Sequence, residues 1–258
     1  MKITVLTENT CKLGGFNCEH GLSLYIEAGR KKILFDMGQT EIFAENAEKM
    51  GIDLADVDIA VVSHGHYDHG GGLSRFLEIN KKAPVYISKY AFGSHFNGTE
   101  KYIGLDLSIQ NSQRLIFTDN FYKICDGFTL YSCNERDSKY NLGSFGLSEK
   151  TEDGFISDRF LHEQYLFIED AGKKVLISGC SHKGILNIAD WFDVDVIAGG
   201  FHFSKHPLDA ILKSYAEILD DTGIHFYTCH CTGLEQYEFM KKYMHKLDYL
   251  STGDTVTV

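Results

Sequence analysis

The chain has 258 residues, of which 43% are hydrophobic and 24% charged, with only 2 prolines, and this is the composition of a folded globular protein. Its formal net charge of −11 offers no broad positive field to nucleic acid or to an anionic lipid surface. We therefore expect one domain over residues 1–258 and neither a nucleic-acid nor a membrane partner.

The amino terminus becomes polar at residues 7–9, too early for the apolar part of a secretory signal, and no apolar run reaches membrane-spanning length. Seven cysteines at irregular spacings in such a chain favour reduced thiols over a disulfide framework. These features predict a cytoplasmic protein. Cys229 and Cys231 flank His230 without the second ligand pair of a closed zinc site, so we interpret both as packing residues.

In the first third of the chain, short runs rich in branched residues and broken by glycines predict strands at residues 3–6, 24–28 and 32–36. Residues 41–50 place apolar side chains along one helical face, and Gly51 ends that predicted helix. A buried type of strand at residues 58–62 leads directly to His64. Apolar residues from Leu73 onward predict a helix packed beneath the segment that follows.

Strands are also predicted at residues 84–88 and 128–133, whereas residues 90–111 and 134–158 show no clean period. We interpret residues 90–111 as an active-site flap or a decorated loop. Towards the carboxyl terminus, strands at residues 165–169, 174–178, 194–198 and 225–228 alternate with amphipathic helices at 209–219 and 233–244. Strands mixed with helices in both halves indicate an α/β fold, with two sheets sandwiched by helices.

The informative histidines directly follow predicted strands: His64, His66 and His69 follow one strand, and His182 and His230 follow two later ones. Loops at the carboxyl ends of strands meet at one edge of a sheet, where distant segments can form a single site. Histidine is the commonest zinc ligand, and catalytic zinc sites leave one position open for water. We therefore predict a catalytic metal site at this edge.

Within the segment from His64 to His69, the first two histidines can face one ion, while Asp68 and His69 can reach a second ion beside it. Carboxylate and imidazole ligands suit zinc, iron(II) or manganese. Asp68 could also orient the attacking water. A single histidine at this place would be interpreted as a solvated loop residue. Four residues of ligand type within six positions, directly after a buried strand, favour metal binding instead. The following helix turns its amino terminus, which favours anions, towards the site.

Residues 64–69 resemble the His-x-His-x-Asp-His motif of the metallo-β-lactamase superfamily. Residues 33–38 resemble the strand and turn that precede this motif in the family, and residues 19–23, 179–184, 199–202 and 230–233 resemble a narrower branch. Members of that branch are labelled metal-dependent hydrolase or 7,8-dihydropterin-6-ylmethyl-4-(β-D-ribofuranosyl)aminobenzene-5′-phosphate synthase. The resemblance implies an α/β fold of the αββα four-layer sandwich type, with a two-metal site at the lip between the sheets.

The resemblance also implies a ligand set. His64 and His66 would bind the first metal, Asp68, His69 and His230 the second, and Asp36 would orient a ligand from behind. The third histidine and the bridging aspartate of the family correspond to His162 and Cys180, and a cysteine at the second position is a departure. His182, two residues beyond, is our preferred ligand there, with Cys180 and His162 as alternatives.

Four residues are predicted to contact substrate: His202 at the leaving group, His20 on the opposite wall, and the aromatic rings of Phe92 and Phe96, which with Tyr102 could stack on a pterin. For both histidines a structural role is an equal alternative. The remaining histidines, at positions 95, 206, 225 and 245, lack such a setting, and we interpret them as ordinary surface or core residues.

The predicted function is metal-dependent hydrolysis of a small anionic phosphoester, ester or lactone, with Asp68 and His202 as catalytic residues. The expected cofactor is a pair of divalent ions, zinc first, with iron or manganese as alternatives. A synthase that joins a dihydropterin to an aminobenzene ribose phosphate on the same metal site is the second hypothesis. A non-catalytic ligand-binding module is the third. The sequence does not decide between a monomer and a homo-oligomer.

Overall fold

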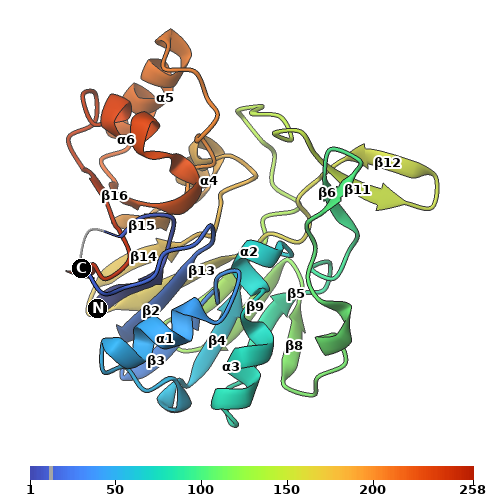
Figure 1. Ribbon diagram of the computed structural model, residues 1–258. Helices are drawn as coiled ribbons and strands as arrows, with labels where there is room; N and C mark the ends of the chain where they lie inside the picture. Colours follow the sequence, from blue (N-terminus) through green and yellow to red (C-terminus); the bar gives the residue numbers. More distant parts are fainter. Residues whose placement is uncertain (12–13) are drawn as a thin grey trace.

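The structure is a computed structural model that describes residues 1–11 and 14–258, and two seven-stranded sheets form its centre (Figure 1). The first sheet runs β18 (Thr255–Thr257), β1 (Lys2–Thr7), β2 (Ser23–Ala28), β3 (Lys31–Phe35), β4 (Ile59–Val62), β5 (Val85–Ser88) and β8 (Leu115–Thr118). The second runs β17 (Leu247–Tyr249), β16 (His225–Thr228), β15 (Val196–Gly199), β14 (Lys173–Ile177), β13 (Tyr165–Asp170), β10 (Phe128–Tyr131) and β9 (Phe121–Cys125).

The two sheets repeat one topology. In the first, β1, β2 and β3 pair antiparallel, and β3, β4, β5 and β8 pair parallel. In the second, β10, β13 and β14 pair antiparallel, and β14, β15, β16 and β17 pair parallel. Each half therefore carries a set of parallel strands whose carboxyl ends point to one edge, which is where α/β sheets place their ligands.

Helices cover the two outer faces, and three apolar cores hold the layers together. Helices α1 (Ile42–Lys49) and α3 (Leu73–Ile79) pack on the first sheet, and α4 (Ile185–Trp191), α5 (Ala210–Asp221) and α6 (Leu234–Met240) pack on the second. The core between the sheets includes Ile26, Val61, Leu130 and Val175. This arrangement confirms the predicted αββα sandwich. The shorter helices are α2 (Tyr67–Gly70), η1 (Leu54–Asp56), η2 (Leu107–Ile109) and η3 (His230–Thr232).

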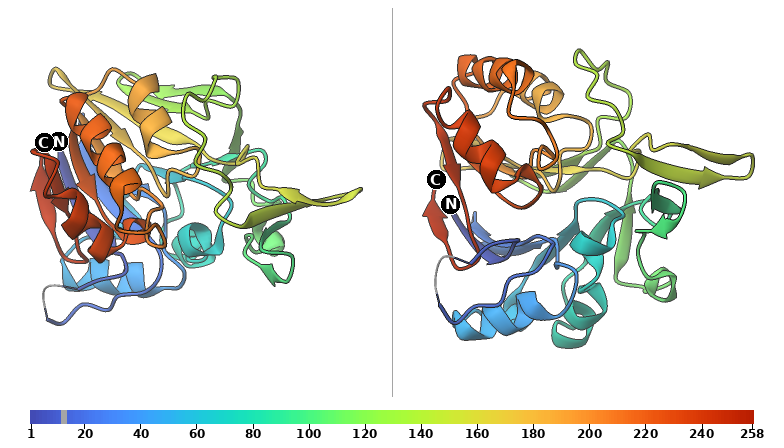
Figure 2. Two further views of the ribbon diagram at one scale, coloured as in Figure 1. Left: turned by 90° about the horizontal axis from the view of Figure 1, so that it is seen from above. Right: turned by 45° about the horizontal axis from the view of Figure 1, so that its top comes forward.

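A third, small sheet projects from one end of the sandwich (Figure 2). It runs β12 (Gly154–Ser157), β11 (Leu147–Thr151), β6 (His95–Asn97) and β7 (Lys101–Tyr102). The two segments that show no sequence period thus meet in space, since residues 90–111 supply β6 and β7 and residues 134–158 supply β11 and β12. Pairing between distant segments, rather than a local pattern, makes these strands.

Cys11 and Cys18 form a disulfide, with their Cα atoms 5.9 Å apart. The prediction that all cysteines are reduced is wrong for this pair, because sequence spacing does not reveal where a loop brings two thiols together. The other five cysteines are free. No helix in the described parts of the chain has the length and apolar character needed to cross a lipid bilayer.

Candidate metal centre

The predicted ligands gather where the parallel strands of both sheets end. Asp36 follows β3 and His64 follows β4 in the first sheet, while Cys180 follows β14, His202 follows β15 and His230 follows β16 in the second. Each residue comes directly or within three positions after the last residue of its strand. The parallel strand order therefore brings residues from across the chain to one edge.

Several of these strand ends hold strained backbone. Asp36, Ser181, His202 and His230 all have positive φ, between 51° and 59°, although none is glycine. Such conformations are uncommon for residues with a Cβ and persist only where surrounding contacts hold them, often at functional sites. Their clustering at one sheet edge is independent support for a functional site there.

The first candidate ligand group consists of His64, His66 and His182, which are all buried and have ligand nitrogens within 4.8 Å of one another. The Nε2 atoms of His64 and His182 lie 3.3 Å apart. The Ser63 hydroxyl donates to Asp36, so at 2.7 Å it can only accept from Nδ1 of His64. His64 consequently carries its proton on Nδ1, which leaves the Nε2 lone pair directed into the cluster.

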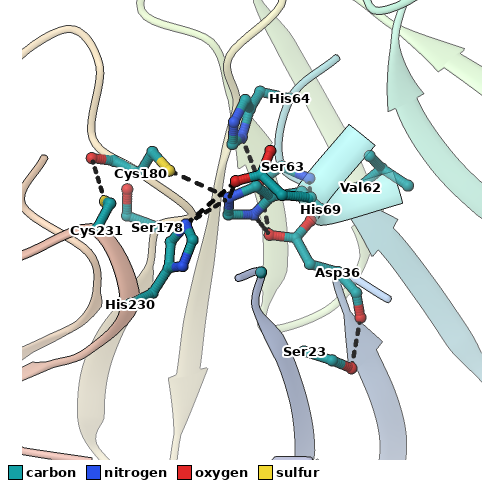
Figure 3. Close-up of polar contacts among 12 residues, drawn as sticks. Ser23, Asp36, Val62, Ser63, His64, His69, Ser178, Cys180, His230 and Cys231 are labelled. Atoms are coloured by element: carbon teal, nitrogen blue, oxygen red, sulfur yellow. Dashed lines mark hydrogen bonds and ion pairs between the residues drawn. The ribbon is translucent and has the colours of Figure 1, made fainter. Parts of the chain in front are cut away.

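The second group consists of Asp68, His69 and His230, and Figure 3 shows the two histidines with Asp36 and Cys180 around them. The Nε2 atoms of the two histidines are 3.2 Å apart, and Oδ2 of Asp68 lies 3.6 Å from the first and 3.4 Å from the second. Nδ1 of His69 donates to Asp36 at 2.7 Å, and Nδ1 of His230 donates to Asn9 at 2.8 Å. Both rings therefore turn Nε2 towards Asp68.

Cys180 lies beside the second group, with Sγ 3.1 Å from Nε2 of His69. Its neighbour Cys231 directs its thiol at the carbonyl of Cys180, 3.6 Å away, and lines the same cavity. Cys229 packs in the core between the sheets. The interpretation of the two later cysteines as packing residues thus holds for Cys229 and is wrong for Cys231, because the chain leaves β16 at Thr228 and turns into η3, which places Cys231 at the cavity.

The electrostatics of the cluster suit a cation. Burial lowers the pKa of His64, His66 and His182, and neighbouring imidazoles lower it further, so these rings are neutral and can donate lone pairs. Burial also acts to lower the pKa of His69, but the carboxylates of Asp36 and Asp68 outweigh it and raise that pKa to about 9. Burial acts to raise the pKa of Asp68, yet the surrounding histidines hold it below its usual value.

Two buried ring nitrogens of the first group, Nε2 of His66 and Nδ1 of His182, have no hydrogen-bond partner among the described residues. Buried polar atoms are almost always paired, so the unpaired Nε2 of His66 points to a group that binds there. The two pairs of facing Nε2 atoms require the same explanation. Imidazole, carboxylate and thiol donors around two neighbouring points fit divalent ions of the zinc type.

A cavity of about 480 Å³ opens onto the cluster. Its wall combines polar and apolar side chains, and it is lined by His20, His66, Tyr67, Asp68, Asn97, Lys101, Ile103, Leu142, Phe145, Leu147, Cys180, His182, His202, Ser204, Lys205, His206, Pro207, His230 and Cys231. The predicted substrate contacts His20 and His202 are both on this wall. Nδ1 of His20 faces the amide nitrogen of Asn9 at 3.3 Å, and its Nε2 lies 3.3 Å from Asp68.

The prediction that Phe92 and Phe96 line the substrate pocket is wrong. Phe92 packs against the core beneath the first sheet, and Phe96 contacts Tyr102 and Phe155 within the small sheet. Neither ring lines the cavity, whose aromatic side chains are Tyr67 and Phe145 together with the histidines. The sequence of residues 90–111 carries no period that would tell which face each ring takes.

His162, the alternative third ligand, stands behind the first group. Its Nδ1 accepts a hydrogen bond of 2.9 Å from the backbone nitrogen of Gly65, and burial lowers its pKa to about 4. His95 and Asp158 lie next to it, and all are buried. Sequence reasoning missed these two partners because they come from the small sheet, whose strands have no local signal.

The family model of the metallo-beta-lactamase superfamily matches residues 17–216 of the chain. An uncharacterised protein of Methanocaldococcus jannaschii is 30% identical over 90% of this chain and 91% of its own length. The 7,8-dihydropterin-6-methyl-4-(beta-D-ribofuranosyl)-aminobenzene-5'-phosphate synthase of the same organism is 28% identical over 99% of this chain and 96% of its own.

A crystal structure described as a metal-dependent hydrolase of the beta-lactamase superfamily superposes with a TM-score of 0.85 and 29% identity, and it covers 100% of this chain and 99% of that one. A diphosphatase of the PhnP family superposes with a TM-score of 0.54 at 14% identity, over 100% of this chain and 97% of that one, which shows likeness of fold. These matches agree with the resemblance carried by residues 64–69.

Proposed function

The chain belongs to the metallo-beta-lactamase superfamily, and from that premise we propose that it is a hydrolase of a small anionic ester or phosphoester that works with two divalent ions. The observation that carries the proposal is the first ligand group together with the contacts among Asp68, His69 and His230 beside it, at the floor of one cavity. His64, His66 and His182 would hold the first ion, and Asp68, His69 and His230 the second. Cys180, beside His69, is an additional ligand for the second ion.

Zinc-type ions bound there would lower the pKa of water towards neutrality and polarise the reacting oxygen of the substrate. Side chains of the protein would position the attacking water and supply a proton to the leaving group. Oδ2 of Asp68 lies 3.3 Å from Nε2 of His20 and 3.4 Å from Nε2 of His230, so its ionised carboxylate would orient the attacking water beside the second ion. Nδ1 of the His202 ring is buried and has no partner among the described residues, which suits a proton donor to the leaving group.

The cavity wall supports an anionic substrate with an apolar part. Lys101 and Lys205 supply positive charge at the cavity, in a protein whose formal net charge is −11. Leu142 and Phe145 form part of the apolar surface, and the Phe145 ring lies next to that of His202, with centroids 4.4 Å apart and the ring planes tilted by 56°. A charged group between the lysines and an apolar group on this wall would place the bond to be cleaved over the ligand groups.

The test is a substrate panel with the zinc-loaded protein, using p-nitrophenyl phosphate, its diester, a thioester and a lactone. We expect metal-dependent turnover of at least one, a loss of kcat of about 100-fold or more in Asp68→Asn, and a smaller loss in His202→Gln with unchanged zinc content. Asp56→Asn, at an exposed carboxylate that pairs with Lys32, is the matched control. Absence of turnover across the panel would favour a non-catalytic binding module and contradict the proposal.

The second candidate is the synthase reaction, which the 28% identical relative of nearly equal length favours. On that proposal the amine of an aminobenzene ribose phosphate would attack the methylene carbon of a dihydropterin methyl diphosphate, and diphosphate would leave. The apolar wall at Phe145 suits the pterin ring better than Phe92 or Phe96, which lie outside the cavity. Incubation with both substrates discriminates, since a product that requires both partners would replace the hydrolase proposal.

A further inference from the structure

A buried chain of polar side chains, His162, Asp158 and His95, lies next to the first ligand group. Nδ1 of His162 accepts from the Gly65 amide at 2.9 Å, and Nε2 of His162 lies 3.4 Å from Oδ2 of Asp158. The same carboxylate oxygen lies 3.0 Å from Nδ1 of His95. Gly65 is the residue between His64 and His66. The chain of side-chain contacts therefore ends at the backbone of residues 64–66, which we call the ligand turn.

His66, His95, Asp158 and His162 are close enough together to hold a cation, but the hydrogen bond to Gly65 argues against that use. A neutral imidazole has one N–H and one lone pair. The lone pair on Nδ1 of His162 is already engaged by the Gly65 N–H, so its Nε2 carries the proton. This nitrogen faces Asp158 at 3.4 Å, a charge contact rather than a hydrogen bond. In this tautomer His162 has no lone pair left for a metal ion.

The Asp158 carboxylate is itself fixed from two sides. Its Oδ1 accepts from the Phe160 amide at 2.7 Å, and Oδ2 faces His95 and His162. Asp158 directly follows β12 and His95 begins β6, so both belong to the small sheet. The chain of contacts therefore connects the small sheet with the ligand turn of the first large sheet.

The conformation of the ligand turn depends on contacts with neighbouring segments. A side chain at Gly65 would collide with the carbonyl of Ala91, so the backbone passes very close to its neighbour there. The Gly65 amide has a buried acceptor, and without His162 it would be left unpaired. A buried N–H without an acceptor is unfavourable, and the turn would move to find one.

We propose that His162, held by Asp158 and His95, is a positioning residue that fixes the Gly65 amide and so aims His64 and His66 at a shared ion. The inference rests on the proposed function only for the identity of those two residues as ligands. It gives His162 a role other than that of a metal ligand, although His162 occupies the position of the family's third histidine ligand. It also gives the small sheet a direct influence on the metal centre.

The experiment combines amide hydrogen exchange at Gly65 in the metal-free protein with zinc titration by calorimetry. The variants are His162→Ala, which removes the acceptor, and His162→Asn, whose Oδ1 can take the place of Nδ1. Asp158→Asn weakens the support of His162. The control is His225→Asn, at a histidine that contacts Asp248 at 2.8 Å outside the site.

We expect exchange at Gly65 to be about 10-fold faster or more in His162→Ala, with zinc affinity of the first site about 10- to 100-fold weaker and an unchanged number of ions. His162→Asn should recover most of both, Asp158→Asn should be intermediate, and the control should match wild type. Wild-type exchange and affinity in His162→Ala would overturn the proposal, and so would the loss of one bound ion in both His162 variants.

If His162→Ala does not fold, the wild-type protein still decides. The nitrogen-15 shifts of the His162 ring should show the proton on Nε2, and a proton on Nδ1 would overturn the proposal. Failure of the proposed function is distinguishable. In that case the wild-type protein binds no zinc, whereas the Gly65 exchange and the His162 tautomer still report on the positioning role.

Discussion

At the scale of single residues, hydrogen bonds behind the ligands decide how the imidazoles point. Ser63 fixes His64, Asp36 fixes His69 and Asn9 fixes His230, each through Nδ1. In each case the acceptor behind the ring leaves Nε2 free for the cluster. The proposed metal chemistry therefore depends on residues that would never touch an ion.

Asp36 is the most connected of these residues, since it accepts from the Ser63 amide at 2.6 Å, from the Ser63 hydroxyl at 2.7 Å and from His69 at 2.7 Å. Asp36→Asn keeps the shape but replaces one acceptor oxygen by a donor. We expect zinc affinity at the second site to fall about 10- to 100-fold, measured by competition with a chromophoric chelator. Asp53→Asn, at the exposed cap of η1, is the control, and equal affinity in both variants would contradict this role.

At the scale of elements, periodicity predicted those strands and helices that are built from local sequence. The strands β1 to β5, β10 and β13 to β16, and the helices α1, α3, α5 and α6, lie within a few residues of the predicted ranges. The site histidines that follow β4, β14 and β16 were predicted by the same reasoning. Alternation between apolar runs and glycine turns is a local signal, and this is why it succeeds here.

Elements that depend on distant partners were not predicted. The edge strands β8 and β9, helix α4 and the strands of the small sheet carry weak or mixed patterns. The site residues that come from the small sheet and from loops were also missed, namely Asn9, His95, Asp158 and Phe145. Their positions follow from tertiary packing, which no window of neighbouring residues encodes.

The glycines at 70–72 join α2 to α3 under the ligand turn, and Gly72, like Gly71, lies very close to neighbouring backbone. A Cβ there would meet the carbonyl oxygens of Met37 and Thr40. We expect Gly72→Ala to lower the free energy of unfolding by about 1–3 kcal/mol, measured by urea denaturation, because the strand-to-helix loop would have to move. Gly14→Ala, whose Cβ would meet no described atom within 4 Å, should change it far less. Equal effects would contradict the close approach.

At the scale of the whole molecule, the candidate metal centre exists only where the two halves meet. The first sheet contributes the segment from His64 to His69, and the second contributes His182 and His230. Ions held between these groups would tie the repeated halves together at the edge away from the core. The arrangement explains why residues separated by more than half the chain belong to one site.

The cavity differs in charge from the molecule as a whole, because Lys101 and Lys205 line it in a protein with a formal net charge of −11. For the best substrate of the panel, we expect Lys101→Ala and Lys205→Ala each to raise KM about 10-fold, as loss of a charged hydrogen bond would, with a smaller effect at high salt. Lys139→Ala, at a lysine paired with Asp190 on the surface, is the control. An unchanged KM in both cavity variants would contradict an anionic substrate group there.

The central claim is that two ions lie side by side between the sheets, and anomalous scattering from crystals of the zinc-loaded protein tests it most directly. We predict two peaks at the zinc absorption edge, one among His64, His66 and His182 and one among Asp68, His69 and His230. Fewer than two peaks at these positions, or a peak bonded to His162 instead of His182, would contradict the account.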